Sequence, residues 1–114
     1  MGHERWPEGV DFAVTVCDRD GRIVDMNERA RATFAKDGGG ALIGRSLFAC
    51  HGPASAALIR DLIGEGRSNT YTVEKAGVRK LIHQAPWYAD GAVAGLVEIS
   101  IVLPEGMPHR VRSA

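Results

Sequence analysis

The chain has 114 residues, which is enough for one hydrophobic core but not for two. Its 14 basic and 14 acidic residues give a formal net charge of zero, which argues against a nucleic-acid-binding module, because such modules need a net basic face. Two cysteines are too few for a disulfide-rich scaffold. No segment is apolar enough for a secretion signal or a transmembrane helix. We therefore expect a cytoplasmic protein without nucleic-acid or membrane partners.

The first half of the chain predicts a hairpin followed by helices. The predicted segments are strands at residues 11–18 and 22–26, a helix at 28–36 and helical turns at 41–43 and 46–51. Gly21 supplies the hairpin turn, and Asn27 is a good N-cap for the helix. Pro7 is expected to prevent a regular helix before the first strand. Three glycines at 38–40 are expected to form a flexible loop, because a glycine run loses too much backbone entropy to stay helical.

The second half predicts one amphipathic helix and then only strands. The predicted segments are a helix at residues 53–63 and strands at 69–75, 78–88 and 93–103. Pro53 is suited to the first position of the helix, and Gly66 follows its end. Asp90 and Gly91 form a hairpin turn, and Pro86 indicates that the end of its strand lies at a sheet edge or a bulge.

This order of elements predicts an α+β fold: one five-stranded antiparallel sheet with the helices packed on one face. Alternation along the last strand places Val97 and Ile99 on one face and Glu98 on the other. We expect three regions along the chain. They are an N-terminal extension at residues 1–8, a single domain at 9–104 and a C-terminal tail at 105–114.

Three stretches of the sequence resemble PAS sensory domains. They are VCDRDGRIVDMNERARATF, IGRSLFACHGPAS and DGAVAGLVEIS, at residues 16–34, 43–55 and 90–100. The resemblance covers roughly residues 9–103. It implies the PAS fold, in which a ligand or core cavity lies between the concave face of the sheet and the central helices. PAS domains are usually sensing and dimerisation modules, so the resemblance implies no catalysis, and the fold alone names no ligand.

A narrower resemblance concerns residues 50–53. Cys50-His51-Gly52-Pro53 is similar to the C-H-P-P motif of PAS domains found beside hemerythrin-like domains in some bacterial proteins. The segment around His83, with the aromatic residues Trp87 and Tyr88 after it, resembles the same group. This chain departs from the motif at Gly52, where the group typically has proline.

Cys50 and His51 could serve several kinds of chemistry, most of which the sequence disfavours. Alignment on the flavin-binding light-oxygen-voltage motif places Leu47, not Cys50, at the adduct-forming cysteine. Adjacent Cys and His side chains diverge, so no catalytic nucleophile is predicted. Cys50, His51 and His83 lack the spacing of a zinc site, so no metal is predicted. His51 remains a candidate axial ligand for noncovalently bound haem, while no cofactor is the first expectation.

Two interpretations of His51 remain open. It either bonds a backbone carbonyl at the mouth of the helix, with Cys50 packing as a small apolar residue, or it forms the polar lip of a small-molecule pocket. The candidate pocket residues are His51, Cys50, Phe48, Leu58, Leu62, His83, Trp87, Val97 and Ile99. We expect a sensory PAS module that binds a small ligand, forms a homodimer and acts on an effector domain or protein. The alternatives are a haem-based gas or redox sensor and a ligand-free dimerisation module.

Overall fold

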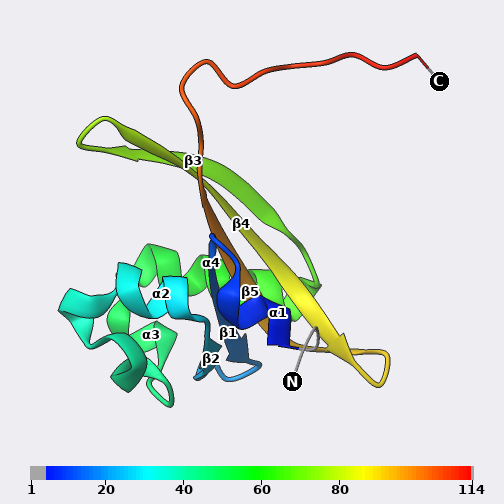
Figure 1. The fold of residues 1–114 in the computed structure, drawn as a ribbon. Helices are drawn as coiled ribbons and strands as arrows, with labels where there is room; N and C mark the ends of the chain where they lie inside the picture. Colours follow the sequence, from blue (N-terminus) through cyan, green and yellow to red (C-terminus); the bar gives the residue numbers. More distant parts are fainter. Residues whose placement is uncertain (1–4, 114) are drawn as a thin grey trace.

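The computed structural model describes residues 5–113, except for the side chain of Cys50. The helices and strands, in chain order, are α1 (Trp6–Gly9), β1 (Ala13–Asp18), β2 (Ile23–Met26), α2 (Glu28–Thr33), α3 (Leu47–Cys50), α4 (Pro53–Glu65), β3 (Asn69–Lys75), β4 (Val78–Ala89) and β5 (Ala92–Val102). The strands form one antiparallel sheet in the order β2-β1-β5-β4-β3. The predicted α+β fold is confirmed: α2, α3 and α4 lie together on one side of the sheet, and the β3–β4 hairpin extends past them (Figure 1).

The turns of the sheet follow from the local sequence. Ala76 and Gly77 join β3 to β4, and Asp90 and Gly91 join β4 to β5. All four residues have positive φ, between 53° and 80°, as a two-residue turn with the twist of the flanking strands requires. The sequence predicted a sheet edge or a bulge near Pro86. Pro86 pairs with Leu96 of β5 and lies beyond the start of β3, and a register shift follows between Trp87 and Tyr88.

Three predicted segments differ in the structure. Pro7 does not prevent a helix: it lies in the first turn of α1, where a backbone N–H has no intrahelical partner in any case. The predicted helix at 28–36 ends at Thr33 and continues as a 3₁₀ helix, Ala35–Asp37. The glycine run is not a plain loop, because a second 3₁₀ helix, Gly39–Leu42, follows directly. These glycines therefore adopt helical geometry despite the backbone entropy that they lose.

Asn27 is the buried junction between the N-terminal segment, β1 and α2. Its predicted capping role is confirmed: Oδ1 accepts the N–H of Ala30 at 3.0 Å. The same oxygen accepts the N–H of Val14 at 2.9 Å, and Nδ2 donates to the carbonyls of Pro7 and Phe12, each at 2.9 Å. One side chain thus satisfies four backbone groups that belong to three segments.

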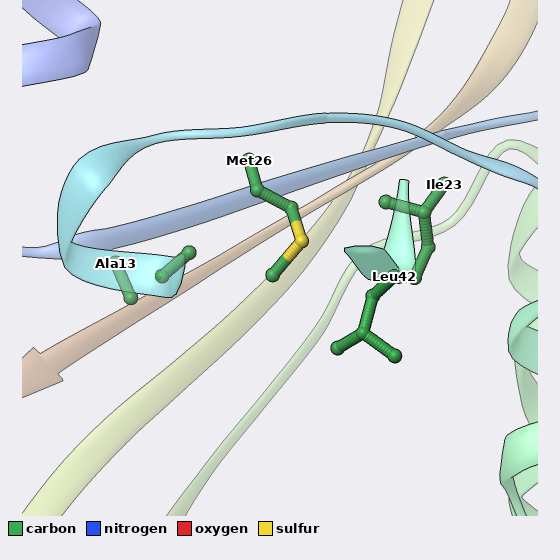
Figure 2. Close-up of a cluster of buried hydrophobic side chains, with 5 residues drawn as sticks. Ala13, Ile23, Met26 and Leu42 are labelled. Atoms are coloured by element: carbon green, nitrogen blue, oxygen red, sulfur yellow. The ribbon is translucent and has the colours of Figure 1, made fainter. Parts of the chain in front are cut away.

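Two apolar clusters form the core on the helical side of the sheet. The first consists of Ala13, Ile23, Met26, Ala30 and Leu42, most of which are labelled in Figure 2. The second consists of Cys17, Ile59, Leu62, Ile63 and Leu96. Leu47, from α3, packs against both clusters. The helices therefore pack against the sheet through two separate clusters, and α3 contacts both of them.

Candidate functional site

A cavity of about 410 Å³ lies between the sheet and the helices. Its apolar wall draws on both core clusters and on the helical segments that cover them. The apolar lining residues are Cys17, Ile23, Met26, Phe34, Leu42, Leu47, Ile59 and Leu96. The side chains of β1 and β5 that face it belong to residues paired across the two strands, such as Cys17 and Leu96. The cavity is thus a gap in the core between the two clusters.

A row of polar side chains crosses the sheet at the floor of this cavity. Asn69, Gln84, Glu98 and Thr15 are direct neighbours on β3, β4, β5 and β1, so their side chains share one face. Asn69 Nδ2 donates to Gln84 Oε1, and Gln84 Nε2 donates to Glu98 Oε1, each at 3.0 Å. Gln84 is only 6% exposed, and it lines the cavity together with Glu98 and Thr15. The floor is therefore polar and hydrogen-bonded, while the walls are apolar.

The rim of the cavity carries exposed polar residues, namely Asp37, Arg45 and His51. His51 follows α3, and its Nδ1 lies 2.8 Å from the carbonyl oxygen of Leu47. A carbonyl oxygen can only accept, so Nδ1 carries the proton and Nε2 of the neutral ring is an acceptor. Both interpretations of His51 are therefore compatible in this structure: the ring bonds a backbone carbonyl and also lines the cavity.

The other candidates from the central helices take different positions. Phe48 is half-buried and packs against the second cluster, with its ring beside Gly21. The guanidinium group of Arg60 stacks on this ring, 4.1 Å from its centre. Leu62 is fully buried in the second cluster. Leu58 is 38% exposed, because the buried face of α4 runs through Ile59 and Leu62 instead. Cys50 lies outside the residues whose side chains are described.

The structure does not bring the predicted strand residues to the cavity. His83, Trp87, Val97 and Ile99 alternate with the floor residues, so they lie on the opposite face of the sheet. We call this face the outer face; its apolar side chains are Val14, Val16, Leu81, Ala85, Trp87, Val97, Ile99 and Ile101. Among the candidates with described side chains, only His51 lines the cavity.

Two observations bear on metal and thiol chemistry. His51 and His83 lie on different sides of the sheet, and among the described side chains, which do not include that of Cys50, no three potential metal ligands gather at one point. Cys17 is 1% exposed, and burial raises the pKa of its thiol, so it packs as a small core residue. As for membranes, none of the helices described is long and apolar enough to span a bilayer.

Sequence reasoning missed Gln84 and Glu98. The alternation of β5 was predicted correctly, but Val97 and Ile99 were the pocket candidates from this strand, and the structure places Glu98 at the cavity instead. A usable signal was present in β1, where the helix-facing positions are Ala13, Thr15 and Cys17. These small residues leave room for a cavity above them, whereas Val14 and Val16 on the other face do not.

Several solved structures share this fold. A VqmA dimer from Vibrio cholerae has a TM-score of 0.70 and 16% identity over 90% of this chain, which spans 50% of that protein. A sensory box sensor histidine kinase from Vibrio cholerae has a TM-score of 0.62 and 16% identity, and 89% of each chain is covered. The Aer2 receptor of Vibrio cholerae, a dual PAS-heme oxygen sensor, has a TM-score of 0.66 and 15% identity over 85% of this chain and 98% of that one.

Comparison of sequences gives the family. No curated protein matches the chain. Three expectations from the sequence stay predictions. They are the resemblance to the C-H-P-P group, the absence of a catalytic role and the absence of nucleic-acid partners. The sequence profile of the PAS fold matches residues 8–105, which is most of the chain. With its five-stranded sheet and helix-covered cavity, this protein belongs to the PAS fold family.

Proposed function

We propose that this chain is a sensory module that binds a small molecule in the cavity and signals through contacts made by the outer face of its sheet. The observation that carries the proposal is the cavity itself. Its volume of about 410 Å³ falls among those of small-molecule sites, and apolar walls with a few converging polar groups are their usual form. The similar structures include a sensor histidine kinase and an oxygen sensor, which supports a sensory role.

Signal transmission follows from where the cavity lies. Its walls come from the sheet and from the helical segments between β2 and β3, so a ligand contacts both layers at once. A ligand that binds one arrangement of these layers more tightly shifts the population toward it. Residues of β4 and β5 alternate between the cavity floor and the outer face. A ligand that changes the twist of these strands therefore also moves the side chains that contact a partner on the outer face.

The first prediction concerns the bound molecule. Protein purified from a cell extract and then denatured is expected to release a small organic molecule, detected by mass spectrometry. Leu96→Phe adds volume inside the cavity and is expected to abolish this release, whereas Leu81→Phe makes the same change on the outer face and is expected to preserve it. Equal yields from the two variants, or an empty wild-type protein after incubation with the extract, would contradict the proposal.

Haem is a second candidate ligand, which one observation favours. His51 lines the cavity with Nδ1 held by a backbone carbonyl, and this arrangement leaves Nε2 available as an axial ligand. The polar floor formed by Gln84 and Glu98 offers no matching contact to a porphyrin ring, so the first candidate fits better. The same mass spectra separate the two, because a released porphyrin, lost in His51→Ala, would identify haem.

The second prediction concerns a homodimer through the outer face. Ile101 is 37% exposed in the single chain, so Ile101→Lys is expected to leave the monomer folded but to place a charge in the dimer contact. Light scattering is expected to show a dimer for the wild type and a monomer for this variant. Val111→Lys, in the exposed tail, is the matched control and is expected to remain dimeric. A wild-type monomer at high concentration would overturn this part of the proposal.

A further inference from the structure

The hydrogen bonds at the cavity floor have a fixed direction. The carboxylate of Glu98 can only accept, so the amide of Gln84 must point its nitrogen toward Glu98 and its oxygen toward Asn69. The hydrogen-bonded part of the row therefore runs from Asn69 of β3 through Gln84 to Glu98 of β5, where it ends on the carboxylate. Both polar atoms of the Gln84 side chain are occupied within the row, and Glu98 is its terminal acceptor.

Glu98 lines the cavity, and no arginine, lysine or histidine of the described residues forms an ion pair with it. The ion pairs formed among residues 5–113 all involve other carboxylates, those of Glu8, Glu65 and Glu74. The half-buried carboxylate lines the cavity and takes one hydrogen bond, at Oε1, from Gln84, which leaves acceptor capacity at Oε2. A carboxylate beside apolar walls is costly unless donors satisfy it, and within a ligand pocket a ligand supplies such donors.

We propose that the cavity selects compact, largely apolar ligands that carry N–H donors, of the amidine or amide type, and that Glu98 receives these donors. The proposal rests on the function proposed above and names the ligand chemistry of the same site. Asp37 at the rim adds a second acidic group against one arginine, Arg45, so the charges lining the cavity favour cationic or neutral ligands over anions. The apolar walls accommodate the body of the ligand.

Four benzene derivatives of similar size test the proposal on the whole chain by NMR titration. Benzamidinium carries only donors, benzamide carries donors and an acceptor, benzoate carries only acceptors, and ethylbenzene is apolar. The expected order of affinity is benzamidinium, then benzamide, then benzoate, with the largest amide shifts near Gln84 and Glu98. This series needs no substitution, so it remains decisive if a variant fails to fold.

Glu98→Gln keeps the size of the side chain and removes the carboxylate. It is expected to weaken benzamidinium binding on the order of tenfold, the usual effect of losing a hydrogen bond to a charged group. Glu105→Gln removes the same charge from an exposed position after β5 and is the matched control, expected to bind like the wild type.

The possible outcomes separate this inference from the proposed function. If ethylbenzene shifts the cavity residues but benzamidinium binds no better than benzoate, or if Glu98→Gln binds benzamidinium as the wild type does, the donor inference is overturned and the pocket remains. If none of the four compounds shifts any cavity residue, the proposal that this cavity binds small molecules is overturned with it.

Discussion

Asn27→Ala is expected to lower the free energy of unfolding by about 3–5 kcal/mol, a large part of the 5–15 kcal/mol typical of small domains. The substitution removes the partners of four backbone groups: the N–H groups of Val14 and Ala30 and the carbonyls of Pro7 and Phe12. Asn27 is 5% exposed, so water replaces these partners poorly. Urea denaturation followed by circular dichroism measures the effect.

Two further variants divide this effect into its parts. Asn27→Asp keeps an acceptor for the two N–H groups but cannot donate to the two carbonyls, so we expect an intermediate loss of stability. Ser46→Ala removes an ordinary N-cap, whose Oγ accepts only the N–H of Phe48, and is expected to cost about 1 kcal/mol. If Asn27→Ala costs no more than Ser46→Ala, then Asn27 is only a helix cap and not a junction.

The same contacts decide how α1 is held. Arg31 forms a bidentate ion pair with Glu8 of α1, but both side chains are substantially exposed, and such pairs contribute little. The bond from the buried side chain of Asn27 to the half-buried carbonyl of Pro7 is the stronger attachment. Loss of this bond in Asn27→Asp is therefore expected to increase hydrogen exchange in α1 before it does so in the sheet.

The sequence predicted the elements well because their signals are local. The Asn27 cap and the Asp90-Gly91 turn each depend on neighbouring residues, and both lie where expected. The helical lengths around the glycines were less predictable, because Gly38 to Gly40 are fixed by contacts with residues further back, such as the backbone N–H of Gly39 on the carbonyl of Phe34. Propensity alone does not contain those contacts.

The candidate site was less predictable than the fold. Alternation along β5 separates Val97 from Glu98 but does not say which face the helices cover. The usual rule that the more apolar face is buried failed, because the cavity needs a polar floor and the apolar outer face stays partly exposed in a single chain. The hydrogen bonds that join Gln84 to Glu98 arise only from strand pairing, which single-sequence patterns do not specify.

Gly95→Ala is expected to cost more than about 3 kcal/mol, and it has the most direct steric cause of any change considered. A Cβ at this position would lie 1.9 Å from the carbonyl oxygen of Cys17 and 2.8 Å from the Cα of Asp18. Both are backbone atoms of β1, so no change of rotamer relieves the contact, and β1 must move away from β5. Gly95 pairs with Asp18, the last residue of β1, beside the buried pair of Cys17 and Leu96, so the movement also disturbs the core at that pair.

The same carbonyl of Cys17 accepts a hydrogen bond from the indole nitrogen of Trp87 at 2.9 Å, so moving β1 also breaks this bond. Trp87→Phe removes this bond together with part of the packing of the indole ring and leaves the backbone of β1 and β5 unchanged; it is expected to cost at least about 1 kcal/mol. Gly64→Ala makes the same chemical change in α4, where nothing lies within 4 Å of the new methyl group, and is expected to stabilise the protein by about 0.5–1 kcal/mol. A Gly95→Ala variant with the wild-type urea midpoint would show that β1 and β5 do not approach this closely. If Gly95→Ala lowers the free energy of unfolding strongly while Gly64→Ala raises it, the cause is the close approach of Gly95 to the backbone of Cys17. The side chain of Cys17 lines the cavity.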